Sequence, residues 1–302
     1  MSIPLNSEGV TNAVERIARR TPLLRAPELS DQLGRPVWLK AECLQVTGSF
    51  KVRGAAARLS ALNDQERMRG VVSCSSGNHG RAVAYVAKKL GIPASVCVPE
   101  WVDPVKLEGI KANGADAVLV GSTFDEAETH ALELSERTGR TYISAYDDPW
   151  VIAGQGTIAL EILGQLGESP AAILTPLSGG GLLGGIASVF AESIEDQTCR
   201  TVAVSAENAA VMLASVRAGH PIELAEEETL ANALAGGIGL NNQYSFKLIQ
   251  DLVHEHVTVT EKQISDAMRY CAMELSLVVE GGGAVAIAAV QSGTWKPTGV
   301  RD

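Results

Sequence analysis

The sequence predicts an α/β protein in which buried strands alternate with helices. Short apolar strand patterns and longer helical patterns follow one another along most of the 302 residues, and glycines or prolines separate them. Such alternation is typical of parallel sheets whose strands are joined by crossover helices. A chain of this length can also hold two domains, each with its own core. We therefore expect two α/β domains with mostly parallel sheets.

The central part of the chain alternates most regularly. Pro93, Gly114 and Gly139 separate its elements. Strands are expected at 71–74, 94–98, 117–120 and 141–143, and helices at 79–90, 104–112 and 123–138. This series predicts a small inserted α/β domain over residues 66–147. The residues on either side, 1–65 and 148–302, are expected to form one larger domain.

The larger domain is expected to contain strands and helices of its own. A helix after Lys51 carries Ala55, Ala56, Leu59 and Leu62, and a helix after Gly156 carries Ile158, Leu160, Ile162 and Leu163. Strands are expected at 37–40, 171–177 and 201–205, and a further helix at 182–193.

Charge and cysteine content exclude several classes of protein. The net charge is −10 and the pI is about 5.1, and the basic residues are scattered, so we expect no nucleic acid and no membrane surface as partner. Five widely spaced cysteines favour reduced thiols over a disulfide framework. Residues 1–24 lack the apolar stretch of a secretory signal. These observations predict a cytoplasmic enzyme.

Three short segments predict a site for a small phosphorylated carbonyl compound. They are 49–51 (Ser-Phe-Lys), 75–80 (Ser-Ser-Gly-Asn-His-Gly) and 178–182 (Ser-Gly-Gly-Gly-Leu). A lysine such as Lys51 forms a Schiff base with a carbonyl when its amine is activated. The last segment follows a strand and opens a helix, and its glycines can direct several N–H groups at one phosphate. Segment 75–80 has the same layout and predicts a second anion pocket, suited to a carboxylate.

A nicotinamide-dependent oxidoreductase is the alternative reading of the third segment. Gly179, Gly181 and Gly184 have the spacing of a dinucleotide fingerprint, and Glu207 follows the next strand. This fingerprint lies past the middle of the chain, however, and it leaves the other two segments without a role. We therefore rank the alternative second.

These segments resemble the fold type II family of pyridoxal 5'-phosphate enzymes, which is tryptophan synthase β-like, and specifically its threonine/serine dehydratase and serine racemase group. The resemblance covers nearly the whole chain. It rests on the motifs at 21–23, 48–55, 75–80, 151–157, 178–182 and 279–284. It implies two three-layer α/β domains, the larger of which binds the cofactor. Residues 235–246 most resemble the hydroxyectoine utilisation dehydratases, which act in hydroxyectoine breakdown.

The resemblance also implies roles for particular residues. Lys51 and Ser76 are the expected catalytic residues, with Ser76 on the face opposite Lys51. Residues expected to bind pyridoxal phosphate are Phe50, Lys51, Asn78, Ser178, Gly179, Gly180, Gly181, Leu182, Gly237 and Glu280. The substrate carboxylate is expected to be held by Ser75, Ser76, Asn78 and His79. A divalent cation is implied at Glu207, although Leu213 replaces the second carboxylate of the cation-binding pair.

The implied reaction is loss of water from a β-hydroxy amino acid, which yields a 2-oxo acid and ammonia. L-threonine or L-serine dehydratase and serine racemase are alternatives within the group, and a homodimer is the expected assembly. In this group a Ser or Cys near the C-terminus contacts the pyridine nitrogen. The sequence ends at Asp302 before a matching segment, so a non-catalytic cofactor-binding protein is a further alternative.

Overall fold

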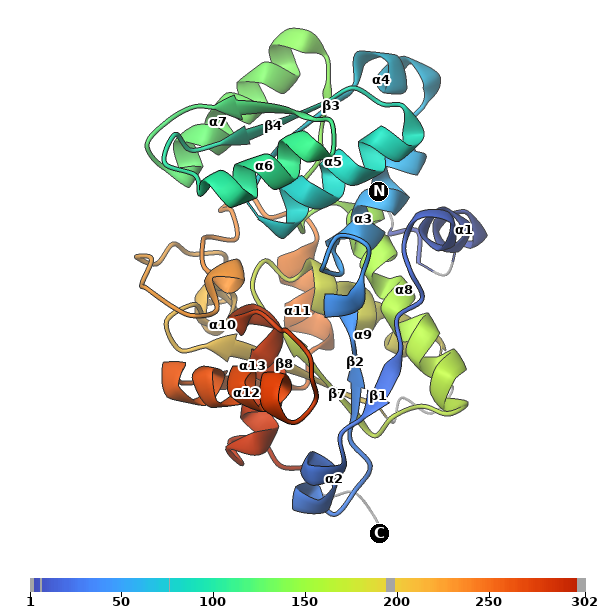
Figure 1. The fold of residues 1–302 in the computed structure, drawn as a ribbon, viewed down its shortest axis with the longest axis vertical. Coiled ribbons are helices and arrows are strands. Elements are labelled where there is room, and N and C mark those ends of the chain that lie inside the picture. The colour runs from blue at the N-terminus through green and yellow to red at the C-terminus, as the bar shows by residue number, and fades with distance from the viewer. Residues whose placement is uncertain (1–2, 6, 76, 194–198, 298–302) are drawn as a thin grey trace. The chain divides into compact units, whose positions relative to one another are not determined.

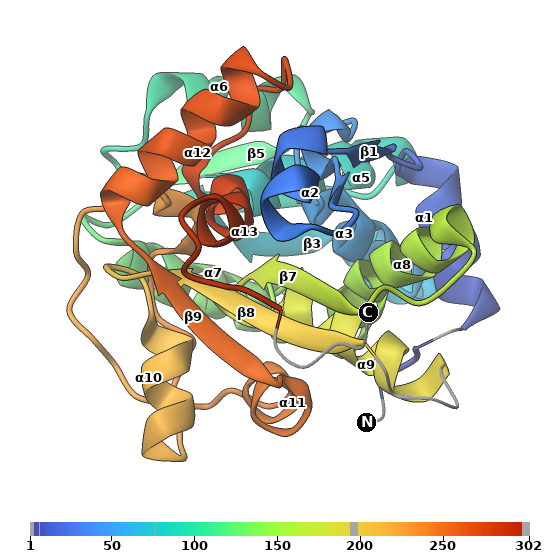
Figure 2. The ribbon, with the colours of Figure 1, turned by 90° about the horizontal axis from the view of Figure 1, so that it is seen from below.

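The computed structural model describes residues 3–5, 7–75, 77–193 and 199–297. Its contacts divide the chain into two compact units. The first unit comprises Met1–Arg20 and Leu44–Thr157, and the second comprises Thr21–Cys43 and Ile158–Asp302. Each unit contains a parallel sheet with helices packed on it, which confirms the expected α/β fold (Figures 1 and 2).

The first unit is built around a four-stranded parallel sheet with strand order β5-β4-β3-β6. The strands are β3 (Val71–Cys74), β4 (Ala94–Val98), β5 (Asp116–Leu119) and β6 (Thr141–Tyr142). The helices between them are α5 (Asn78–Leu90), α6 (Pro104–Ala112) and α7 (Phe124–Thr138). All of these lie within one residue of the predicted ranges, because alternating buried strands and capped helices give strong local signals.

Helices cover both faces of this sheet (Figure 1). Val72 and Cys74 of β3 pack with Ala127 and Ala131 of α7. Val71 belongs to the other core cluster, together with the buried residues of α5. Successive strand residues point to opposite faces, so one short strand contributes to both layers of core.

Two further helices of the first unit pack closely where they cross. They are α3 (Lys51–Ser60) and the first half of α8 (Pro149–Leu166). A Cβ added to Gly154 would lie 2.6 Å from the Arg53 carbonyl and 2.8 Å from the Gly54 Cα. Only glycine allows this approach, so the crossing holds the helix that begins with Lys51. The unit also contains α1 (Glu8–Ile17) and α4 (Asp64–Arg69).

The division by contacts differs from the predicted domain boundaries. Residues 44–65 and 148–157 group with the inserted sheet rather than with the C-terminal part of the chain. The reason is that α3 packs against α5 and α1, burying Val52, Ala55, Ala56 and Leu59 in the core of the first unit.

The second unit contains a three-stranded parallel sheet of order β7-β8-β9 and a two-stranded antiparallel sheet. The parallel strands are β7 (Ala172–Pro176), β8 (Arg200–Ala206) and β9 (Glu255–Val259), and the antiparallel pair is β1 (Leu23–Arg25) and β2 (Trp38–Lys40). Figure 2 shows α13 on one face of the parallel sheet and α9 and α11 on the other.

The helices of the second unit follow the strands in chain order. They are α2 (Pro27–Leu33), α9 (Gly181–Ser193), α10 (Val211–Ala218), α11 (Ser245–Leu252), α12 (Glu261–Met273) and α13 (Gly281–Gln291). Single-turn 3₁₀ helices are formed by Glu42–Leu44 and Asn232–Leu234. Among the described residues, no helix has both the length and the apolar character needed to span a membrane.

Candidate active site

Lys51 occupies the first position of α3 in the first unit. Its Nζ donates a hydrogen bond of 2.8 Å to the carbonyl oxygen of Ala145 and lies 5.3 Å from the centre of the Phe50 ring. Phe50 is the residue before the helix. The lysine is half-buried, so its amine is held in a defined place rather than extended into solvent.

The turn before Lys51 contains two buried hydroxyl groups. Thr47 and Ser49 are each only 5% exposed, and their hydroxyl oxygens have no hydrogen-bond partner among the described residues. Buried polar atoms are nearly always paired in folded proteins. These two hydroxyls therefore fit a polar molecule bound beside the lysine.

The 75–80 segment of the first unit forms the start of α5. The Ser75 hydroxyl accepts a hydrogen bond of 3.2 Å from the Gly77 N–H, and Asn78 is the first residue of the helix. A Cβ on Gly80 would lie 2.2 Å from the Ser75 carbonyl oxygen, so the loop can fold back onto the helix only because residue 80 is glycine. Ser76, a predicted catalytic residue, lies outside the described residues.

His79 is the second residue of α5 and is 3% exposed. Its Nε2 lies 3.0 Å from the Ile143 carbonyl oxygen. Because a carbonyl oxygen can only accept, Nε2 carries the ring proton and Nδ1 is an acceptor. Nδ1 is buried and has no partner among the described residues. Burial, followed by the nearby positive charge of Lys51, lowers the pKa of His79 to about 3.

Because His79 is neutral, we do not expect its imidazole ring to bind the substrate carboxylate. Its single ring N–H is donated to Ile143, so the side chain has no N–H left for a substrate carboxylate at neutral pH. The backbone N–H of His79 lies in the first turn of α5, where N–H groups lack intrahelical acceptors. If His79 holds a carboxylate, it therefore does so through its backbone.

The pKa of His79 predicts a pH dependence of stability. The unfolded chain binds a proton at this residue below about pH 6.5, whereas the folded chain does so only near pH 3. Stability from this group is therefore complete above about pH 6.5 and is lost as the pH falls toward 3. We expect the His79→Gln variant, which cannot titrate, to lose about 2 kcal/mol less than the parent between pH 7 and pH 5.

Urea unfolding of both proteins at several pH values measures this difference. His220→Gln, at an exposed histidine, is the matched control and should follow the parent. Equal pH dependence in the parent and His79→Gln would contradict the buried neutral imidazole.

The 178–182 segment of the second unit joins β7 to α9. Gly180 has a φ of +85°, and a Cβ there would lie 3.0 Å from Ile249 Cγ1 and 3.2 Å from Ser245 Cβ. Gly181 is the first residue of α9. The turn therefore brings bare backbone to the positive end of a helix, as the sequence predicts for a phosphate-binding loop.

Both loop-to-helix segments fit the anionic groups of pyridoxal phosphate and its substrate. The first turns of α5 and α9 contain no acidic residue. A carboxylate there would occupy the free N–H groups and repel an anion. With the held amine of Lys51 and the unpaired hydroxyls beside it, the two units contain the donor groups that this cofactor requires.

Three other predicted residues lie in exposed parts of the second unit. Gly237 is in the connection before α11 and has open space around it, and Glu280 immediately precedes α13. Glu207 follows β8 and is exposed. The described residues contain no group of three or more His, Cys, Asp or Glu side chains that could hold a metal. Cation binding at Glu207 stays a prediction.

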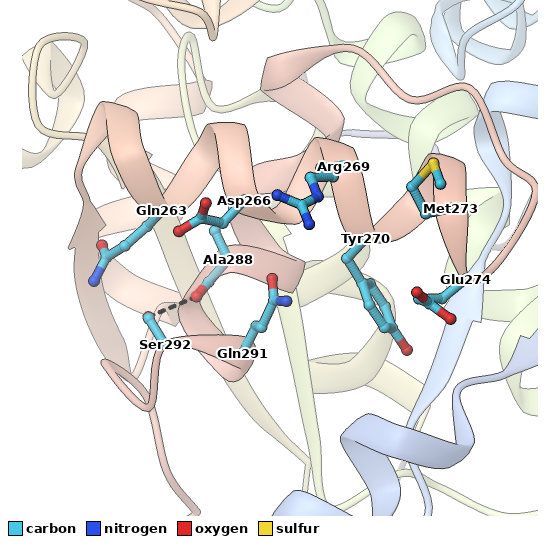
Figure 3. Close-up of a pocket in the computed structure, with 9 residues that line it drawn as sticks. All are labelled: Gln263, Asp266, Arg269, Tyr270, Met273, Glu274, Ala288, Gln291 and Ser292. Atoms are coloured by element: carbon cyan, nitrogen blue, oxygen red, sulfur yellow. Dashed lines mark hydrogen bonds between the residues drawn. The ribbon is translucent and has the colours of Figure 1, made fainter.

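A separate pocket of about 360 Å³ lies between α12 and α13. Figure 3 shows side chains that include Asp266, Arg269, Tyr270 and Gln291 around it. None of the predicted site residues lines this pocket.

Sequence reasoning missed the loop that follows β6. The carbonyl of Ile143 accepts from His79 and from the Ser73 hydroxyl, and the carbonyl of Ala145 accepts from Lys51. Backbone carbonyls carry no residue signature. The signal that was available is position, because the loop follows the carboxyl end of a parallel strand, where α/β proteins place their sites.

Comparison with known proteins identifies the family. The family described as pyridoxal-phosphate dependent enzyme matches residues 14–299. L-threonine ammonia-lyase of Thermotoga maritima is 38% identical over 277 residues, which is 92% of this chain and 68% of that protein. The structure of maize serine racemase superposes with a TM-score of 0.87 at 33% identity, covering 95% of this chain and 86% of that one.

A second solved structure gives the same result. Processed threonine deaminase isoform 2 from Solanum lycopersicum has a TM-score of 0.87 at 36% identity, covering 98% of this chain and 88% of that one. The expected relationship to the threonine dehydratase and serine racemase group is confirmed at this level. The chain belongs to the pyridoxal-phosphate dependent enzymes of fold type II.

Proposed function

We propose that this protein is an ammonia-lyase that converts a β-hydroxy amino acid into a 2-oxo acid and ammonia. The observation that carries the proposal is the half-buried amine of Lys51, held at 2.8 Å from a backbone carbonyl at the start of α3. The similarity to L-threonine ammonia-lyase and threonine deaminase supports the choice of reaction. Water is lost in the elimination and regained in the hydrolysis that releases ammonia.

Lys51 has two roles in this proposal. Its Nζ would hold pyridoxal phosphate covalently, and the same atom would accept the substrate α-proton. When bound, pyridoxal phosphate supplies an electron sink for the α-carbon. Both roles depend on a defined position of Nζ, which its hydrogen bond to the Ala145 carbonyl provides.

The cofactor phosphate and ring are assigned separately. We assign the phosphate to the backbone N–H groups of 178–182, because Gly180 and Gly181 leave the first turn of α9 bare. Phe50 would pack on the ring, Asn78 would bind its 3-hydroxyl, and Gly237 and Glu280 would lie near it. These assignments rest on the family resemblance together with the loop geometry.

The substrate carboxylate is assigned to the first turn of α5. The Ser75 hydroxyl and the N–H groups of Asn78 and His79 would bind it, with Ser76 as a further donor. In this arrangement the positive end of α5 attracts the carboxylate, and the His79 imidazole does not bind it.

The identity of the β-hydroxy amino acid is the finer part of the proposal. L-threonine is the substrate that the names of two relatives suggest. L-serine is the other substrate expected of the group, and serine racemisation is the alternative that the maize enzyme suggests. The resemblance of residues 235–246 to hydroxyectoine utilisation dehydratases favours a β-hydroxy amino acid that arises in hydroxyectoine breakdown. A cytoplasmic location and a homodimer remain predictions.

Two measurements test the proposed function. The first is a visible absorption spectrum after addition of pyridoxal phosphate, followed by borohydride reduction and peptide mapping, which should place the cofactor on Lys51. The second is assay of 2-oxo acid, ammonia and D-amino acid from L-threonine, L-serine and hydrolysed hydroxyectoine.

Different outcomes have different meanings. A cofactor adduct on Lys51 with 2-oxo acid and ammonia in equal amounts supports the lyase. D-serine without 2-oxo acid would favour a racemase. A cofactor adduct without any turnover would favour a non-catalytic binding protein, and absence of cofactor binding would contradict the proposal.

A further inference from the structure

The Ala145 carbonyl, which accepts the hydrogen bond from Lys51, belongs to a peptide group that other hydrogen bonds hold in place. The Ala145 carbonyl oxygen and the Tyr146 N–H lie on opposite sides of one planar trans peptide. Lys51 Nζ donates to the carbonyl at 2.8 Å. On the other side, the Ser144 hydroxyl oxygen accepts from the Tyr146 N–H at 3.4 Å and from the Asp147 N–H at 3.1 Å. The Ser144 side chain therefore sets the plane in which the carbonyl faces the lysine.

The loop is anchored at its far end to the helix that carries Lys51. Asp148 Oδ1 accepts from the N–H groups of Trp150 and Val151 at 2.8 and 3.0 Å, which caps α8. Its Oδ2 accepts from Arg58 Nε at 2.9 Å, and Arg58 lies two turns after Lys51 on α3. The loop that carries the Ala145 carbonyl is therefore linked, through Asp148 and Arg58, to the helix that carries the Lys51 amine.

The near end of the loop is anchored to the parallel sheet. Ile143 N–H donates to the Val72 carbonyl at 2.8 Å, and the Ile143 carbonyl accepts from the Ser73 hydroxyl at 2.9 Å and from His79 at 3.0 Å. Between these two anchored ends, the Ser144 hydroxyl oxygen accepts from two successive backbone N–H groups of the loop, those of Tyr146 and Asp147.

The orientation of the Ala145 carbonyl affects proton transfer by Lys51, because it fixes the direction of the amine. A neutral amine that donates one N–H to a fixed acceptor cannot rotate freely about its Cε–Nζ bond, so its lone pair points in a defined direction. Proton transfer depends on such alignment, and small misplacements lower rates strongly.

We propose that Ser144 is a positioning residue for Lys51, acting through the carbonyl of Ala145. The inference rests on the proposed function, in which Lys51 must leave the cofactor and accept a proton at Nζ. During that interval the Ala145 carbonyl holds the free amine, and Ser144 keeps the carbonyl in place.

The test compares Ser144→Ala, which removes the hydroxyl, with Ser144→Thr, which keeps it. In Ser144→Ala we expect kcat to fall by about five- to tenfold, the loss for one hydrogen bond, while KM and the content of bound cofactor stay within about twofold of the parent. Ser144→Thr should restore kcat. Ser135→Ala is the control, because the Ser135 hydroxyl also bonds to the backbone of the same unit, donating to the Arg140 carbonyl, but away from Lys51.

A second readout does not depend on turnover. Reductive methylation of the cofactor-free protein with formaldehyde, followed by mass spectrometry of the Lys51 peptide, reports the reactivity of the amine. A carbonyl that is held less firmly leaves the amine less fixed, so the extent of methylation of Lys51 at a given pH should differ between Ser144→Ala and the parent, and Ser144→Thr should match the parent. His79, the other titratable group facing the amine, is unchanged in every variant.

The outcomes separate the inference from the proposed function. Unchanged kcat and unchanged methylation in Ser144→Ala would overturn the inference, as would a Ser144→Thr variant as impaired as Ser144→Ala. Absence of cofactor on Lys51 in the parent would instead refute the proposed function, and the methylation result would still decide whether Ser144 positions the amine.

Discussion

Lys51→Ala is expected to lower kcat by on the order of 10⁴-fold, because the variant loses both the covalent attachment of the cofactor and the base that accepts the α-proton. The side chain removed is the one whose Nζ lies 2.8 Å from the Ala145 carbonyl. The measurement is steady-state production of 2-oxo acid, together with mapping of the cofactor adduct after borohydride reduction. We expect no adduct in the variant, although it should still bind some cofactor non-covalently through the glycine loop.

Lys88→Ala provides the matched control. Lys88 also donates to a backbone carbonyl, that of Ala112 at 3.2 Å, but it is exposed on α5. Its replacement should leave turnover and adduct formation unchanged. Substantial residual activity in Lys51→Ala would remove the lysine from the proposed mechanism.

Gly180→Ala is expected to weaken cofactor binding by about 100-fold or more, which corresponds to about 3 kcal/mol. Two effects add. A φ of +85° disfavours any residue with a Cβ, and the new methyl group would lie 3.0 Å from Ile249 Cγ1 and 3.2 Å from Ser245 Cβ. The backbone must shift to relieve these contacts, and the shift moves the N–H groups assigned to the phosphate. Titration of the protein with pyridoxal phosphate, followed by absorbance, measures the change.

Gly219→Ala is a control that separates the effect of a positive φ from the effect of crowding by the new methyl group. Gly219 ends α10 with a φ of +80° and has nothing within 4 Å of an added Cβ. This variant carries the backbone penalty without the crowding and is far from the proposed phosphate loop in sequence. It should lose some thermal stability and bind the cofactor as the parent does. Equal cofactor affinity in Gly180→Ala and the parent would contradict the phosphate assignment.

Several features of the fold could be predicted because they depend on local signals. Strands β3 and β4 were predicted without error from continuous apolar runs between glycine and proline. The helix predicted at 182–193 from a glycine-rich segment after a buried strand begins one residue earlier, at Gly181. The antiparallel pairing of β1 with β2 was not predicted, since three-residue strands carry too little pattern to reveal their partners.

The candidate site also has features that the sequence predicts and features that it does not. Residue chemistry and spacing predict Lys51, the start of α5 and the glycine loop as parts of the site, because each requires a particular residue type. The protonation state of His79 could not be predicted, since it depends on burial and on the carbonyl of a residue 64 positions away in the chain.

The sequence by itself determined the α/β alternation, the lysine and the two glycine-rich turns, which together indicated the family. Tertiary structure alone decided that α3 groups with the inserted sheet and that His79 is neutral and donates to Ile143. It also decided that Ser144 forms hydrogen bonds within the loop next to Lys51 and that Asp148 pairs with Arg58 on the helix of that lysine. The physical reason is that helices, strands and turns follow from neighbouring residues, whereas burial and hydrogen-bond partners depend on which distant segments pack together.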